Sequence, residues 1–232
     1  HSAIMARSWG IPAVLGVSGL LGQVESGQAA VLDALAGTLD TAPDAAAQQE
    51  AQKKLDAWRK DTDEAQRFLR APATTRDGVR VEIGLNLGSV STQALEASHA
   101  TDFVGLLRTE FLYLEASHMP TEEEQYTAYK KVLLEYAPRP VTVRTLDIGG
   151  DKTLPYFELP KEENPFLGLR ALRLCFAHPH LLRTQFRAAL RAAAHGSLWL
   201  MLPMVSGVED FCRAKQMLEQ TRAELDAQGA GP

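Results

Sequence analysis

The sequence has few of the residues that form covalent or metal cross-links. Only two of its 232 residues are cysteines, Cys175 and Cys212, and they lie far apart, each in a helix-like run. Structural zinc sites use Cys or His ligands paired at short spacing, and the two cysteines form no such pair. Both are therefore predicted to be small buried core residues rather than a disulfide, which fits a reducing, cytoplasmic setting.

Long apolar runs and an excess of positive charge are also missing. No run approaches the roughly 20 apolar residues of a membrane span, and the first residues do not read as a signal peptide. A net charge of -5 argues against a protein that coats nucleic acid or anionic membrane. What is present is a chain that is 45% hydrophobic, enough for one or two domains, with 24 Lys and Arg from which a local anion site can be built.

Composition divides the chain into three zones. Residues 1–41 hold short apolar pieces cut by Gly and Pro, which indicates part of a small α/β domain. Residues 42–72 are rich in Ala, Gln, Glu, Lys and Arg, and Pro72 closes the run, so we predict a solvated helix that links two domains. In residues 73–232, strand-like and helix-like runs alternate.

The third zone predicts a parallel α/β sheet, because strands that alternate with helices form parallel sheets. The strand candidates are 79–87, 103–108, 141–147 and 198–205, and the helix candidates are 91–100, 121–136, 179–194 and 208–228. A (β/α)8 barrel of the TIM type needs about 250 residues, so these four units predict its first half. Half a barrel has two open edges, and we expect the chain to be truncated; pairing of two half barrels would also cover such edges.

Two arginines occupy equivalent places in this pattern. Arg108 and Arg144 each lie toward the C-terminal end of an apolar strand, the end that faces the active site of a βα barrel. A guanidinium matches phosphate or carboxylate oxygens two at a time, so the pair favours anion binding. The alternative is ordinary pairing with nearby acids, here Glu110 or Asp147.

Weaker candidates surround this pair. Gly149 and Gly150 permit a tight turn and a close approach to a ligand, and Lys152 follows them with a positive charge. Arg170 ends a loop-like stretch, where a merely solvated arginine is the alternative. His1 precedes what resembles the first turn of a helix, whose positive end would stabilise a phosphoryl group on the imidazole; a terminal remnant without function is the alternative.

Five segments together resemble one family. Residues 1–16, HSAIMARSWGIPAVLG, are similar to the phosphohistidine signature of the phosphoenolpyruvate (PEP)-utilising enzymes, from the histidine onward. The later strings GLLRTEFLYLE, PTEEEQ, VRTLDIGGDKTLPY and PKEENPFLGLRALR are similar to enzyme I of the sugar phosphotransferase system, in the same order. The resemblance covers essentially the whole chain and is weakest over the linker helix.

The resemblance implies a function and roles for the candidates. PEP would phosphorylate His1, which would pass the phosphoryl group to the carrier protein HPr. Arg108 and Arg144 would grip the phosphate of PEP, supported by Lys152 and Arg170. Residues 1–41 would be the C-terminal part of the swivelling phosphohistidine domain, 42–72 the linker helix, and 73–232 the N-terminal half of the PEP-binding barrel.

The resemblance also implies parts that this sequence does not contain. The family's Mg²⁺ ligands, a Glu and an Asp, would lie beyond Pro232, as would the cysteine that protonates the enolate and much of the homodimer surface; the HPr-docking region would precede His1. We therefore expect no turnover from these residues alone. Two alternatives are a non-catalytic PEP-binding or regulatory module and a piece of a pyruvate phosphate dikinase or PEP synthase, against which the DIGGDK string argues.

Overall fold

A computed structural model describes residues 6, 10–68, 71–91, 95, 100–149, 154–160 and 162–231. The chain divides into two compact units, His1–Leu69 and Arg70–Pro232. Among the described residues, no helix is both long enough and apolar enough to cross a membrane.

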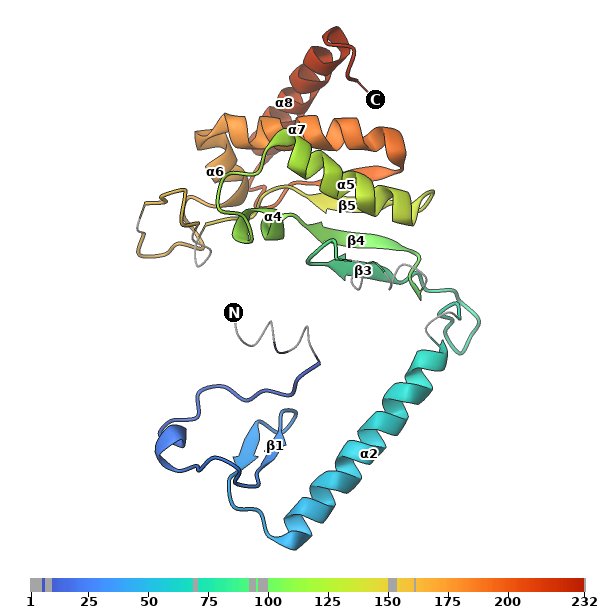
Figure 1. Ribbon diagram of the computed structural model, residues 1–232. Helices are drawn as coiled ribbons and strands as arrows, with labels where there is room; N and C mark the ends of the chain where they lie inside the picture. Colours follow the sequence, from blue (N-terminus) through green and yellow to red (C-terminus); the bar gives the residue numbers. More distant parts are fainter. Residues whose placement is uncertain are drawn as a thin grey trace. The chain divides into compact units, whose positions relative to one another are not determined.

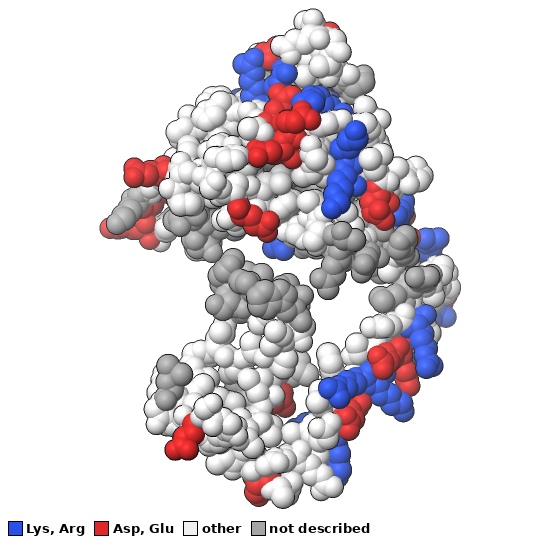
Figure 2. Space-filling model, viewed as in Figure 1, with Lys and Arg blue, Asp and Glu red and all other residues white. Residues whose placement is uncertain are grey.

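The first unit contains a small hairpin and a long polar helix. A short 3-10 turn, η1 (Leu20–Gly22), precedes the antiparallel strands β1 (Val31–Asp33) and β2 (Thr38–Asp40). Helix α2 (Ala45–Phe68) follows, and Asp44 caps its start by accepting a hydrogen bond from the backbone N–H of Ala47 at 2.7 Å. The helix buries none of its residues, and charges of both signs alternate along it (Figure 2), so the predicted solvated helix is confirmed.

The second unit is built on a parallel sheet, as predicted. Its strands are β3 (Gly84–Leu87), β4 (Phe103–Arg108), β5 (Val141–Arg144) and β6 (Leu198–Met201), and their order in the sheet is their order in the chain. The intervening helices are α4 (Glu110–Leu114), α5 (Glu122–Tyr136), α6 (Ala171–Ala177) and α7 (Pro179–Ala192), followed by the 3-10 turn η3 (Ala193–His195), and α8 (Val208–Ala227) comes after β6. The described strands thus follow the β-then-α order of a barrel segment.

Local sequence signals explain where three of the helices begin or end. Thr121 caps α5, accepting from the backbone N–H of Glu124 while the Glu124 carboxylate accepts from the backbone N–H of Thr121, so the predicted capping box is confirmed. Pro179 occupies the first turn of α7, where its missing N–H costs no intrahelical hydrogen bond. Gly229 ends α8 with a φ of +67°, a left-handed conformation that favours glycine.

The main core lies between the sheet and a layer formed by α5 and α7 (Figure 1). Strand β5 shows the alternation clearly: Val141 and Val143 are fully buried against the helices, whereas Thr142 and Arg144 lie on the other face of the sheet. A second core underlies the loop after β5 and includes Leu146, Ile148 and residues of α6, α7 and α8. The segment that carries the candidate arginines is therefore anchored by packing on its helix side.

Several predicted boundaries are wrong, some because of a local turn and some because of partners far away in the chain. The strand candidate 79–87 is regular only from Gly84, because residues 73–81 instead fold back on themselves through an isolated bridge between Thr74 and Arg80. The candidate 141–147 ends at Arg144, because the carbonyl oxygen of Arg144 accepts from the Thr109 hydroxyl and the backbone N–H of Leu146 donates to Gln185. The candidate 198–205 ends at Met201. Helix α4 was not predicted, and most of the helix candidate 91–100 lies outside the described residues.

The two cysteines lie in different environments, which corrects one prediction. Cys175 on α6 is buried as predicted, and burial raises the pKa of its thiol to about 12, so it stays protonated. Cys212 on α8 is exposed, and its assignment to the core is wrong. The helix-like run around Cys212 indicated a helix correctly, but which face of a helix is covered depends on its neighbours.

Candidate functional site

The two candidate arginines end neighbouring parallel strands and stand directly opposite each other in the register of the sheet. Between Val104 and Leu107, strand β4 has one residue more than the paired segment of β3 and one residue more than the paired segment of β5. Counted from Val104 without that bulge, Leu107 would lie opposite Arg144. The irregularity at Gly105 and its neighbour therefore aligns Arg108 with Arg144, as bulges beside active sites commonly re-aim side chains.

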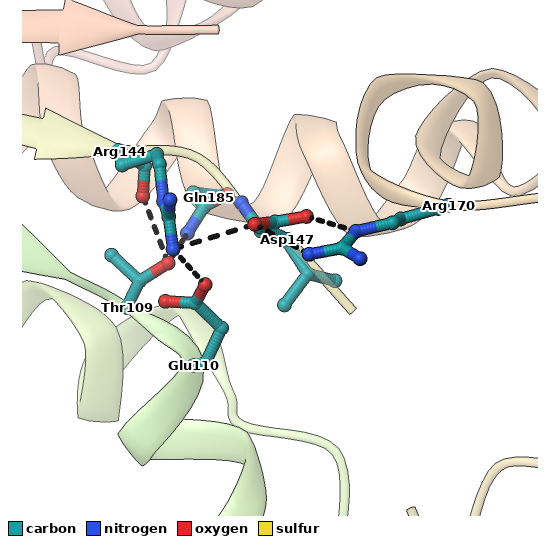
Figure 3. Close-up of polar contacts among 7 residues, drawn as sticks. Thr109, Glu110, Arg144, Asp147, Arg170 and Gln185 are labelled. Atoms are coloured by element: carbon teal, nitrogen blue, oxygen red, sulfur yellow. Dashed lines mark hydrogen bonds and ion pairs between the residues drawn. The ribbon is translucent and has the colours of Figure 1, made fainter. Parts of the chain in front are cut away.

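Two carboxylates compensate the charge of Arg144. Its guanidinium forms an ion pair with Glu110, the first residue of α4, and lies 3.4 Å from Oδ2 of Asp147. Asp147 also accepts two hydrogen bonds from Arg170, from Nε at 2.7 Å and from Nη2 at 3.2 Å (Figure 3). The Arg144 and Glu110 side chains are 17% and 5% exposed, so water screens this pair only weakly. Arg144 thus makes the pairs with Glu110 and Asp147 that were the alternative to anion binding.

Arg108 differs from Arg144 in its exposure and in its partners. Its side chain is exposed, and it forms no hydrogen bond or ion pair with the part of the chain that the structure describes. Its Nη2 atom lies over Gly88, where an added Cβ would come within 2.6 Å of it. Like charges placed opposite each other on adjacent strands repel, and the two acids beside Arg144 do not reach Arg108. Within the described residues, Arg108 therefore leaves a positive charge without a carboxylate partner next to the cluster around Arg144.

Gly149 allows the loop after β5 to approach the start of α6. A Cβ at this position would lie 2.8 Å from the carbonyl oxygen of Leu169 and 2.9 Å from Cα of Arg170, and the φ of Gly149 is +123°. Both the space and the backbone conformation thus favour glycine. The close approach sets Arg170 beside Asp147, so Arg170 joins the same cluster as Arg144 rather than being merely solvated.

A buried polar layer lies beneath the strand ends and was not predicted. Thr109 Oγ1 donates a hydrogen bond to the carbonyl oxygen of Arg144 at 2.9 Å, and Gln185 of α7 bonds to both Thr109 Oγ1 and the backbone N–H of Leu146. Gln185 also contacts the hydroxyl of Tyr129, whose pKa burial raises far above its usual value, so this hydroxyl remains a donor. A polar residue on the apolar stripe of the 179–194 helix was the signal that could have found Gln185.

Two of the predicted site residues, His1 and Lys152, lie outside the described residues. Within the described ranges, no group of three or more His, Cys, Asp or Glu side chains converges as a set of metal ligands. Glu110 and Asp147, the acids of the site, are engaged by arginines. These residues therefore do not fit a Mg²⁺ site by themselves.

Two protein families match the chain in succession. Residues 62–232 match the family described as PEP-utilising enzyme, PEP-binding domain, which accounts for most of the chain. The chain belongs to the PEP-utilising enzymes. Residues 1–37 match the mobile domain of PEP-utilising enzymes. The arginine pair and the parallel sheet thus lie inside the region that matches a PEP-binding domain.

The similar curated proteins are phosphoenolpyruvate-protein phosphotransferases. The chain is 45% identical over 229 residues to the protein of Staphylococcus carnosus, covering 99% of this chain and 40% of that relative. It is 43% identical over 225 residues to the Bacillus subtilis protein, covering 97% of this chain and 40% of the relative. It is a homologue of enzyme I, and it spans 40% of the length of these relatives.

Proposed function

We propose that this chain carries the acceptor histidine and part of the PEP site of a phosphoenolpyruvate–protein phosphotransferase. In the proposed reaction, the bond between the phosphorus and the enol oxygen of PEP breaks and a bond from the phosphorus to an imidazole nitrogen of His1 forms. The enolate takes up a proton and leaves as pyruvate. The phosphohistidine then gives its phosphoryl group to HPr, the first step of PEP-dependent sugar phosphotransfer.

The observation that carries this proposal is the register of Arg108 and Arg144 at the C-terminal ends of parallel strands. PEP carries a phosphate and a carboxylate, both of which suit bidentate contacts from guanidinium groups. Phosphoryl transfer depends mainly on positioning and on stabilising charge on the transferred group, and both arginines supply positive charge there. We propose that Arg170 and Lys152 add to this charge.

The remaining parts of the proposal concern the rest of the protein. The four strands would form the first half of a (β/α)8 barrel, α2 would connect it to the swivelling domain, and the complete protein would act as a cytoplasmic homodimer. Mg²⁺, when bound, would neutralise charge on the phosphate of PEP. Within this chain, the arginines orient PEP and hold its phosphate, and His1 accepts the phosphoryl group.

The proposal is tested by mass spectrometry of the complete gene product under alkaline conditions, which preserve phosphohistidine. The protein and its His1→Ala variant are incubated with PEP and Mg²⁺. A phosphate adduct on the protein that is absent from the variant would support both the reaction and the role of His1. A folded protein that binds PEP without forming the adduct would support the alternative of a binding or regulatory module.

A further inference from the structure

We propose that Gln185 is a positioning residue that holds Arg144 in register with Arg108, so that both guanidinium groups can grip one phosphate. The inference rests on the proposed function and adds a residue on a helix behind the sheet to the PEP site. Gln185 lies in the middle of α7 and is fully buried. A buried amide needs partners for all its polar atoms, so its contacts define what it does.

The direction of each hydrogen bond around Gln185 follows from its partners. The backbone N–H of Leu146 can only donate, so it must face Oε1 of Gln185, at 2.8 Å. The Nε2 atom then faces Thr109 Oγ1 at 3.2 Å and the Tyr129 hydroxyl at 2.9 Å, and donates to both. Thr109 Oγ1 in turn donates a hydrogen bond to the carbonyl oxygen of Arg144 at 2.9 Å (Figure 3). Gln185 therefore ties the ends of two strands to one helix.

These bonds act where the sheet stops. After Arg144, the backbone N–H of Thr145 still bonds to the carbonyl oxygen of Met201, but the next N–H, that of Leu146, turns to Gln185. The carbonyl oxygen of Arg144 is taken by the side chain of Thr109, the residue that directly follows Arg108. Thr109 thus connects the ends of β4 and β5. Gln185, on the helix side of the sheet, hydrogen-bonds to Thr109 and to the backbone of Leu146 and so stabilises this connection.

A matched residue separates positioning from stability. Gln125 of α5 is 1% exposed and belongs to the same network. Its Oε1 accepts from the Tyr129 hydroxyl at 3.1 Å, and its Nε2 donates to the carbonyl oxygen of Pro120 at 3.1 Å. Neither bond reaches a strand end. Replacement of either glutamine by Met keeps the volume and leaves buried groups without partners, so both variants should lose stability.

The experiment measures PEP affinity and urea unfolding of the complete gene product and of the variants Gln185→Met and Gln125→Met. We expect both variants to unfold at lower urea. Only Gln185→Met should weaken PEP binding, by about tenfold to 100-fold, because a displaced Arg144 would lose charge-assisted hydrogen bonds to the phosphate, whose loss has effects of that size. Equal affinity in the two variants, at comparable loss of stability, would overturn the inference.

Two further measurements keep the test decisive. Thr109→Val removes the hydroxyl that joins Gln185 to Arg144, and the double variant with Gln185→Met should bind PEP no more weakly than the poorer single variant. Additive losses would contradict a single chain of contacts. If Gln185→Met does not fold, Thr109→Val alone is compared with Gln125→Met.

Absence of PEP binding by the unaltered protein would refute the proposed function itself, whereas normal binding with unaffected variants would refute only the role of Gln185.

Discussion

Two clusters in the second unit consist of the same kinds of side chain, two arginines and two carboxylates. The site cluster comprises Arg144, Arg170, Glu110 and Asp147, and the helix cluster comprises Arg187, Arg191, Glu122 and Glu123. Each is neutral by formal charge. Composition alone therefore does not distinguish the proposed binding site from a structural ion-pair network, and the difference must come from the surroundings.

The surroundings differ in exposure and in what lies next to them. The side chains of the site cluster are at most 17% exposed, whereas Glu123 of the helix cluster is 66% exposed. The helix cluster joins the first turn of α5 to α7, and Tyr126 packs on Arg191 with the guanidinium carbon 4.3 Å from the ring centroid. The site cluster adjoins Arg108, an additional positive charge at a strand end. That extra charge is the basis of the proposal that the site cluster binds an anion.

The largest difference between the two clusters is expected when one arginine is removed from each. Arg144→Met leaves Glu110 and Asp147 buried without that partner, which should cost about 3 kcal/mol of the free energy of unfolding and abolish measurable PEP binding. Arg191→Met, the control, should cost about 1 kcal/mol or less, because its pairs are more exposed, and should leave PEP affinity unchanged. Urea unfolding and calorimetric titration measure both. Similar losses from the two variants would show that the clusters are equivalent.

Arg108 tests whether the extra charge is what sets the site cluster apart. Arg108→Ala should weaken PEP binding by about 1.5–3 kcal/mol, the contribution of hydrogen bonds to charged groups. Stability should stay within about 0.5 kcal/mol, because the side chain is exposed. Arg222→Ala on α8 is the control for a general loss of positive charge and should affect neither quantity. A large stability loss in Arg108→Ala would mean that its role is structural.

The sequence predicted the position of both arginines and named Glu110 and Asp147 as acids that could pair with them, but it did not predict the alignment of the two arginines. Strand periodicity located Arg108 and Arg144 at strand ends, because that signal is local. Their alignment depends on a bulge, and a bulge is visible only once the partner strands are paired. The end of β5 was predicted too late for a similar reason: the N–H of Leu146 is captured by Gln185, 39 residues further along the chain. A contact between residues so far apart in the chain produces no periodic pattern in the sequence from which the strand end could be predicted.

Gly149 tests how far the position of Arg170 contributes to the site cluster. Gly149→Ala would place a Cβ against the backbone of Leu169 and Arg170 at an unfavourable φ, which should cost at least about 1 kcal/mol of stability and also weaken PEP binding. Gly78→Ala is the control, because Gly78 has a φ of +86° but no atom within 4 Å of an added Cβ. It should lose stability without any change in affinity. Chemical unfolding and PEP titration of both variants distinguish strain near the site from strain elsewhere.

The smallest expected effect concerns the pH dependence of the helix cluster. Burial alone would raise the pKa of Glu122, but hydrogen bonds from Arg187 and Arg191 outweigh it, and the pKa lies below its ordinary value of 4.5. A carboxyl group with a lowered pKa stabilises the fold above its unfolded pKa, and this contribution is lost as the pH falls through the folded value.

Glu122→Gln should therefore cost up to about 1 kcal/mol near pH 7, and its difference from the unaltered protein should shrink as the pH falls below 4.5. Glu219→Gln, in an exposed pair with Lys215 at 3.9 Å, should show almost no difference at either pH. Thermal unfolding across this pH range measures the effect, and PEP affinity at pH 7 should not change in either variant. A change in affinity with Glu122→Gln would mean that the helix cluster is coupled to the strand ends, and the distinction between the two clusters would fail.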